Sequence, residues 1–198
     1  MPLSICVYSS SSDHLDPVYY ETARELARQM ASRGHTLVYG GGNNGLMGAM
    51  ATEMQRTGGG RIVGVIPVAL RDAGYGLETV DEQIVTDGMR DRKAVMEERA
   101  DAFIALPGGF GTFEELLEVV TLKQLRYHAK PIVIFDVASY YDPLLEQFER
   151  MFERRFAKRK FAQLYHVSRK AAEALDYLEN YRPDPDAKRG IDKYGSDA

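Results

Sequence analysis

Short apolar runs of strand length alternate with longer helical patterns along most of this chain of 198 residues. We predict strands at residues 3–8, 36–39, 61–66, 81–86, 102–106 and 131–135. We predict helices at residues 18–33, 46–56, 89–99, 112–127, 141–155 and 168–181. Such alternation is typical of parallel strands joined by helical crossovers, with helices on both faces of the sheet. The sequence therefore predicts an α/β fold with a mostly parallel sheet.

Residues 1–182 are expected to form a single domain. Hydrophobic residues make up 44% of the chain and charged residues 27%, so the chain can bury a core and is not disordered throughout. Residues 183–198 contain two prolines, two glycines and four aspartates, with little apolar material. That composition predicts a mobile C-terminal tail, or a segment that becomes ordered only against a partner subunit.

Charge and cysteine content exclude several classes of protein. A net charge of −4 argues against a general nucleic-acid binder. Cys6 is the only cysteine, which excludes a disulfide framework and a cysteine-based zinc site within one chain. The histidines show no helical i, i+4 pair, so we predict no metal site. Because we find no signal peptide and no run of about 20 apolar residues, we expect a cytoplasmic protein without a membrane segment.

Two glycine-rich loops each follow a predicted strand and open a predicted helix. Residues 40–48 read GGGNNGLMG, and residues 107–115 read PGGFGTFEE. Glycines allow a phosphate to approach the backbone closely, and a helix start presents free N–H groups to it. Neither loop has the spacing of a kinase or ATPase P-loop. Because both follow strands, they can face one cleft at the edge of the sheet where ligands bind in such folds.

Spacing alone leaves structural alternatives open for three clusters. Thr112 and Glu115 fit a capping box, in which the Glu115 carboxylate binds a backbone N–H instead of a ligand. The charged run at residues 90–93 is typical of a solvated helix start, although one guanidinium could turn into the cleft to bind an anion or a ribose hydroxyl. The four serines at residues 9–12 form a polar turn or contribute hydroxyl and N–H groups to the same phosphate.

Three motifs together resemble the Lonely Guy (LOG) family of cytokinin riboside 5′-monophosphate phosphoribohydrolases, many of which were once labelled lysine decarboxylases. They are G-G-G-x-x-G-L-M-G at residues 40–48, M-x-x-R-K at 89–93 and P-G-G-x-G-T-x-x-E at 107–115. The resemblance covers roughly residues 3–178, in the family's order and spacing. It implies a Rossmann-like three-layer sandwich, and a homodimer whose active site lies near the subunit interface. It implies no metal and no organic cofactor.

The reaction that the resemblance implies is hydrolysis of the N-glycosidic bond of an adenosine 5′-monophosphate. The substrate would be AMP or a cytokinin nucleotide modified at N6, and the products the free base and ribose 5-phosphate. Arg92 and Glu115 match the family's catalytic pair. The expected nucleotide contacts are Lys93, Gly108, Gly109, Gly111, Thr112, Glu114 and Thr121, together with Gly41, Gly42, Gly45 and Ser10 of the first loop and the serine turn.

Two departures from the family pattern leave the choice of base open. Arg90 stands where many members have His, and the first strand leads into Tyr8-Ser9-Ser10-Ser11 instead of Cys-Gly-Ser-Ser. The family loop that supplies an acidic contact has no clean match at residues 71–82, where Asp72 or Glu78 is the candidate replacement.

Three other functions make different demands on the sequence. A non-catalytic nucleotide sensor or carrier would use the glycine loops but need neither Arg92 nor Glu115. An NAD-dependent oxidoreductase would carry its glycines after the first strand, and here they follow the second. A pyridoxal-phosphate decarboxylase would need a cofactor lysine, which nothing in the sequence marks. The sequence thus favours the hydrolase, in which a fixed carboxylate stabilises positive charge on the ribose and orients water.

Overall fold

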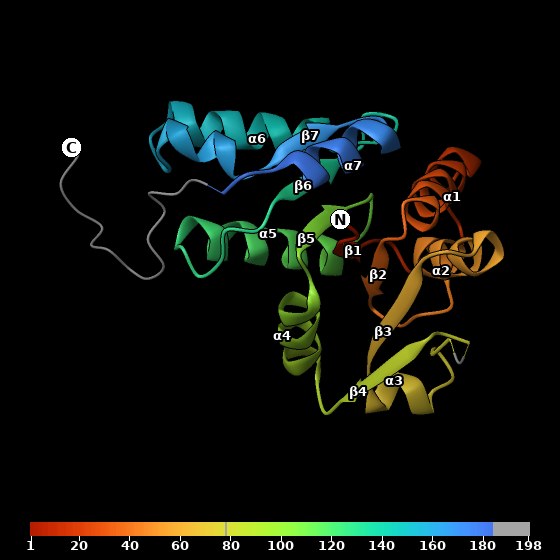
Figure 1. Ribbon diagram of the computed structural model, residues 1–198. Coiled ribbons are helices and arrows are strands. Elements are labelled where there is room, and N and C mark those ends of the chain that lie inside the picture. Colours follow the sequence, from red (N-terminus) through yellow and green to blue (C-terminus); the bar gives the residue numbers. More distant parts are fainter. Residues whose placement is uncertain (78, 184–198) are drawn as a thin grey trace.

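The computed structural model describes residues 1–77 and 79–183, which contain one sheet of seven parallel strands (Figure 1). The strands lie in the order β4-β3-β2-β1-β5-β6-β7. Their bounds are β1 Ser4–Tyr8, β2 Thr36–Tyr39, β3 Arg61–Pro67, β4 Glu82–Thr86, β5 Ala102–Ala105, β6 Ile132–Phe135 and β7 His166–Ser168. Each pairing between neighbouring strands is parallel, which confirms the predicted α/β class.

Helices cover both faces of the sheet and complete the expected three layers. One face packs against α1 (Pro17–Ser32), α2 (Gly45–Thr57) and α7 (Ala171–Asn180). The other face packs against α4 (Met89–Arg99), α5 (Phe110–Gln124) and α6 (Asp142–Glu153). The short helix α3 (Val68–Asp72) contacts β3 and β4, and the 3₁₀ helix η1 (Arg159–Leu164) contacts α5 and α6. Figure 1 shows α1 and α2 on one side of the strands, with α4 and α5 on the other.

The two hydrophobic cores follow directly from the sequence periodicity. Strands β5 and β6 are buried on both faces, as expected for interior strands of a parallel sheet. Helix α1 buries one stripe at helical spacing, made of Ala23, Leu26, Ala27, Met30 and Ala31. Pro17 begins this helix, and Gly34, with a φ of +74°, follows its end in a conformation that suits glycine.

The sequence predictions differ from the structure where elements are short. Strand β7 was not predicted, because its three residues at the edge of the sheet carry too little periodicity. The predicted helix at residues 168–181 begins only at Ala171, after that strand. The short helix α3 (Val68–Asp72) was not among the predicted helices. Of the predicted tail, residues 184–198 lie outside the described part of the chain.

The strand order places a switch point between β1 and β5. The chain builds outward from β1 through β2, β3 and β4, then returns to the other side of β1 with β5. In open sheets of this kind, ligands bind in the crevice at the carboxyl ends of the strands beside such a reversal. The serine turn leaves β1 there, and the second glycine loop leaves β5. No described helix is long and apolar enough to cross a membrane.

Candidate functional site

A cavity of about 680 Å³ lies at the carboxyl ends of the strands. Its walls come from the serine turn, both glycine loops, α4 and the segment after α3. The predicted site residues that line it are Ser10, Gly42, Arg92, Gly109, Gly111, Thr112, Glu114 and Glu115. The predicted residues outside its lining are Gly41, Gly45, Lys93, Gly108 and Thr121. We call this cavity the carboxyl-edge cavity.

A buried ion pair between Arg92 and Glu115 forms the floor of the carboxyl-edge cavity. Arg92 Nη1 donates to Glu115 Oε1 at 3.1 Å, and Arg92 Nε donates to the Val65 carbonyl at 3.1 Å. The two residues are only 7% and 8% exposed. The capping-box hypothesis is therefore wrong: α5 begins at Phe110 with Gly109 as its N-cap, which places the Glu115 carboxylate beyond the helix start. Of the charged run at residues 90–93, Arg92 is the residue that turns inward.

Gly40 allows the Arg92 guanidinium to reach Glu115. A Cβ atom built on Gly40 would lie 1.7 Å from Arg92 Nη2 and 2.9 Å from Cζ. No side chain can occupy that volume while the guanidinium is there. The sequence analysis did not include Gly40 among the site residues, although it is the first glycine of the triplet that follows β2.

Burial makes the Glu115 carboxylate more basic than an ordinary glutamate. Loss of solvation raises its pKa, and the Arg92 guanidinium opposes that rise. The pKa of Tyr8, which also lines the cavity, is raised well above its usual value because its ring is buried. The site therefore offers one carboxylate of raised basicity beside a fixed guanidinium and a neutral phenol.

We expect the Glu115 side chain to titrate above the ordinary glutamate value of 4.5. Since burial disfavours the charged form, the carboxylate takes up a proton at a higher pH than an exposed glutamate as the solution is acidified. Carboxyl ¹³C NMR of glutamate-labelled protein measures this midpoint, and the Glu115→Gln variant assigns the resonance. A Glu115 midpoint at or below 4.5 would contradict the expectation.

Helix α5 begins at the wall of the carboxyl-edge cavity, and its amino end is not capped by a side chain. No side chain caps it at Gly109, and the first N–H groups of a helix have no acceptor within the helix. A Cβ atom built on Gly109 or Gly111 would meet nothing within 4 Å, so packing does not require glycine at either position. The open space beside these N–H groups suits an anionic group that must approach the backbone.

Gly108 serves packing instead of lining the cavity. A Cβ atom there would lie 2.0 Å from Thr112 Oγ1, so the absence of a side chain lets Thr112 fold back onto the loop. Thr112 is 4% exposed and lies in the cavity wall. Gly108 also accepts a hydrogen bond from the Tyr140 hydroxyl, which ties the loop to the segment before α6.

Gly41 and Gly45 shape the first glycine loop from behind the cavity wall. Both have positive φ, +72° and +57°. A Cβ atom on Gly45 would lie 2.6 Å from the Ser10 carbonyl oxygen, and one on Gly41 would lie 3.0 Å from Ile66 Cβ. The loop is also fastened to the segment after α3, because Asn43 N–H donates to the Tyr75 carbonyl at 3.0 Å.

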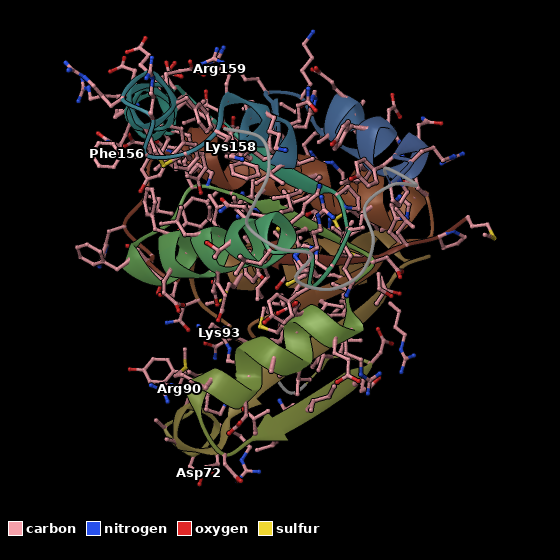
Figure 2. All side chains as sticks on the ribbon, turned by 90° about the vertical axis from the view of Figure 1, so that its left-hand side faces the viewer. Asp72, Arg90, Lys93, Phe156, Lys158 and Arg159 are labelled. Carbon is pink, nitrogen blue, oxygen red and sulfur yellow. The ribbon has the colours of Figure 1, made fainter. Side chains whose placement is uncertain are left out.

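Lys93 and Thr121 lie outside the cavity lining. The Lys93 ammonium forms an ion pair with Glu118 at 2.8 Å and a second one with Glu114. Thr121 is exposed farther along α5. Figure 2 shows Arg90 and Lys93 near the amino end of α4, where Arg90 is exposed to solvent.

Of the two acidic candidates on the 71–82 segment, Asp72 lies outside the lining and pairs with Arg71 at 2.7 Å. Glu78 lies outside the described residues. The apolar part of the wall was not predicted from the sequence. It consists of Val7, Tyr8, Met47, Ile66, Leu70, Tyr75, Met89, Met96 and Phe110. A signal for some of it was present, because Met89, Arg92 and Met96 share one face of a predicted helix.

Comparisons with known proteins agree with the motifs. A family described as "Possible lysine decarboxylase" matches residues 47–178. Cytokinin riboside 5′-monophosphate phosphoribohydrolase LOG2 of Arabidopsis thaliana is 40% identical over 92% of this chain and 85% of its own. The rice protein named cytokinin riboside 5′-monophosphate phosphoribohydrolase LOG is 41% identical over 91% of this chain and 74% of its own.

Among solved structures, the molybdenum cofactor carrier protein of Chlamydomonas reinhardtii superposes with a TM-score of 0.68. It is 24% identical, and the match covers 90% of this chain and 97% of the carrier. A molybdenum cofactor binding protein of Rippkaea orientalis gives the same TM-score at 19% identity, over 90% of this chain and 97% of its own. At these identities the likeness concerns the fold alone. From the family match and the sequence relatives, the chain belongs to the LOG family of cytokinin riboside 5′-monophosphate phosphoribohydrolases.

Proposed function

We propose that the protein is a phosphoribohydrolase that cleaves the N-glycosidic bond of cytokinin nucleotides or AMP. The products are the free base and ribose 5-phosphate. The observation that carries this proposal is the buried Arg92–Glu115 pair in the same cavity as the uncapped start of α5. A nucleotide sensor would need the helix start but not a buried, solvent-poor carboxylate beside it.

The reaction requires water to replace the base at C1′ of the ribose. As the bond from C1′ to the base nitrogen breaks, its electron pair leaves with the base and positive charge builds on the sugar. The Glu115 carboxylate stabilises that charge and accepts a hydrogen bond from the attacking water. The water gives its hydroxyl to C1′ and its proton to the carboxylate, and that proton is then passed on to the departing base, directly or through solvent, which leaves Glu115 ionised again. The raised pKa of Glu115 suits this step, because a more basic carboxylate accepts a proton more readily.

Arg92 is a positioning residue for Glu115 in this scheme. Its guanidinium is held from two sides by the Val65 carbonyl and by the carboxylate itself. The guanidinium donates to one oxygen of the carboxylate, Oε1, and in our proposal the other oxygen, Oε2, binds the water. The rigid β3 strand under Val65 thus fixes the guanidinium, and the guanidinium fixes the carboxylate.

The 5′-phosphate of the substrate binds at the start of α5 in our proposal. The free N–H groups and the open backbone at Gly109 and Gly111 receive its oxygens. Binding energy at the phosphate orients the scissile bond, which lies several bonds away from it. The base then faces the apolar side of the cavity, where Met47, Leu70 and Met96 stand.

Release of free base from a nucleotide panel tests the proposal. Chromatography measures the base released from AMP, N6-isopentenyl-AMP, GMP and CMP. Adenosine, which lacks the phosphate, is the comparison substrate. We expect kcat/KM for adenosine to be lower than for AMP by roughly a hundredfold, because the nucleoside loses its anchor. Equal turnover of AMP and adenosine would contradict the phosphate site. Tight binding of nucleotides without release of any base would favour a carrier instead.

The same proposal includes a second copy of the chain at the mouth of the cavity. Large apolar side chains are exposed around it: Phe110 at 97%, Met89 at 52% and Tyr75 at 50%. On the outer face of α5, Leu117 is 42% exposed. Apolar groups gathered on one face are typical of a protein interface, whereas scattered ones are not.

We therefore expect Leu117→Asp to shift the protein from dimer to monomer in sedimentation velocity. A charge at the centre of an apolar interface is not compensated when the two copies meet. Val18→Asp is the matched control, because Val18 is also 42% exposed but lies on α1, across the sheet. Loss of the dimer in both variants, or in neither, would contradict an interface on the α5 face.

A further inference from the structure

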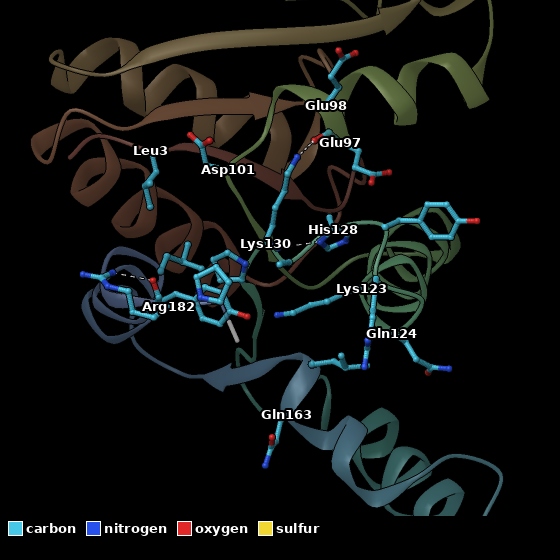
Figure 3. Close-up of a pocket in the computed structure, with 18 of the residues that line it drawn as sticks. Leu3, Glu97, Glu98, Asp101, Lys123, Gln124, His128, Lys130, Gln163 and Arg182 are labelled. Carbon is cyan, nitrogen blue, oxygen red and sulfur yellow. Dashed lines mark hydrogen bonds between the residues drawn. The ribbon is translucent and has the colours of Figure 1, made fainter. Parts of the chain in front are cut away.

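A second and larger cavity, of about 1190 Å³, lies at the opposite edge of the sheet (Figure 3). Asp101 and Pro131 line it just before β5 and β6 begin, so it opens at the amino ends of these strands. Its other walls come from the carboxyl ends of α4, α5 and α7 and from η1. We call it the amino-edge cavity. It shares no lining residue with the carboxyl-edge cavity.

Lys123 of α5 carries a buried ammonium that no described group of this cavity neutralises. The residue is 8% exposed. Among the described residues, Lys123 Nζ and Tyr39 Oη are the only buried side-chain nitrogen or oxygen atoms without a hydrogen-bond partner. The Lys123 ammonium lies 4.8 Å from the centre of the Tyr181 ring. Figure 3 shows the side chain reaching from α5 into the cavity.

The carboxylates of the amino-edge cavity are engaged elsewhere or point away. Asp101 accepts the Ser4 N–H at 2.8 Å. Glu179 contacts His35 at 2.9 Å and Arg33 at 3.2 Å. The carboxylates of Glu97 and Glu98 point away from Lys123 in Figure 3. The cavity therefore holds four acidic side chains, and none of them forms an ion pair with Lys123.

The other basic groups that face Lys123 are already occupied. Lys130 Nζ donates to the Glu97 carbonyl at 2.7 Å. His128 Nδ1 accepts the Lys130 N–H at 3.2 Å, so its other nitrogen, Nε2, carries the proton that bonds the Val119 carbonyl at 2.9 Å. Burial lowers the pKa of His128 to about 4, which keeps its ring neutral. Of Lys123, His128 and Lys130, Lys123 is thus the one whose side-chain nitrogen has no hydrogen-bond partner among the described residues.

We propose that the amino-edge cavity binds a small oxyanion, a phosphate or carboxylate group, on the Lys123 ammonium. A buried charge without a counterion destabilises the folded state, and a bound anion offsets that cost. Burial lowers the pKa of Lys123 to about 8, as expected for an ammonium that lacks such a partner. The Tyr181 ring covers the amine from a position just after the end of α7.

NMR of lysine-labelled full-length protein tests the proposal with inorganic phosphate and with acetate as probes. The Cε and Nζ shifts of Lys123, assigned through Lys123→Met, report its charge and its pKa. We expect saturable shifts with at least one probe, and a Lys123 pKa roughly one unit higher at saturation. A response to both probes would mean that the cavity accepts carboxylate groups as well as phosphate groups. A response to phosphate alone would restrict the ligand to phosphate groups. Lys123→Arg is expected to keep anion binding, measured by calorimetry, whereas Lys123→Met is expected to lose it.

Phosphate is also expected at the start of α5, so the backbone amide resonances of Gly109 and Gly111, which line the carboxyl-edge cavity, report binding there. The inference is overturned if the Lys123 shifts do not move with either probe, whether or not these two amides respond. It is also overturned if dialysed protein already shows Lys123 at its ordinary pKa of 10.5 or above, because the amine would then be partnered by another part of the protein. Neither result depends on whether the protein hydrolyses nucleotides.

Discussion

Replacing Glu115 with Gln is expected to lower kcat for base release by roughly 10²–10⁴-fold while nucleotide affinity stays close to normal. The amide keeps the size of the side chain and can still accept a hydrogen bond from Arg92 Nη1. It has no negative charge to stabilise the sugar and cannot accept a proton from water. Because the proposed phosphate site lies at the start of α5, the change is expected to leave the main binding contacts in place. Single-turnover kinetics and equilibrium binding of AMP measure the two effects separately.

Glu118→Gln is the matched control for this variant. Glu118 lies three residues farther along α5, is 41% exposed and pairs with Lys93 instead of Arg92. We expect its kcat to stay within a factor of about two of wild type, as for most surface substitutions. A Glu115→Gln enzyme with near-normal kcat would remove Glu115 from the reaction. A fall in kcat that is matched by a fall in affinity would assign Glu115 to substrate binding.

The alternation of strands and helices was enough to predict the architecture, because burial on both faces of a parallel sheet leaves a strong pattern. The starting residue of α5 could not be predicted in the same way. Thr112 and Glu115 satisfy the spacing of a capping box, yet the helix begins earlier, at Phe110, with a glycine as its N-cap. Local spacing cannot distinguish these two registers. Packing of Thr112 against the glycine loop and of Glu115 against Arg92 decides between them.

Charged residues on a buried helical stripe give the sequence signal that points to both cavities. Helix α5 buries Thr112, Glu115, Leu116, Val119 and Lys123. Glu115 and Lys123 therefore occupy positions where apolar residues are expected, one near each end of the helix. The sequence does not reveal what faces them, because Arg92 comes from a separate helix and Tyr181 from the far end of the described chain. Such long-range contacts depend on the topology of the sheet.

Gly40→Ala is expected to reduce kcat/KM by roughly a hundredfold or more, although Gly40 has no side chain that could take part in the reaction. The added methyl would lie 1.7 Å from Arg92 Nη2, so the guanidinium must leave its place above the loop. Arg92 then no longer holds the Glu115 carboxylate, and the carboxylate loses its fixed position. The same methyl would lie 3.2 Å from Met47 Sδ, so the loop cannot easily move away from Arg92 to make room for it.

A double-mutant cycle separates this mechanism from general damage to the fold. If Gly40 acts through Arg92, the Gly40→Ala/Arg92→Ala double variant is expected to be little worse than Arg92→Ala alone, because the displaced group is already absent. Gly88→Ala is the control for added bulk, since its nearest new contact is Asp91 Oδ2 at an ordinary 3.8 Å. Thermal unfolding of each variant checks that the protein is folded at the assay temperature. Additive losses of activity in the cycle would mean that Gly40 does not act through Arg92. Full activity of Gly40→Ala would show that the Arg92–Glu115 contact is not required for the reaction. The expected outcome would show that the site requires the space left by glycine at residue 40, because the Arg92 guanidinium that positions Glu115 occupies it.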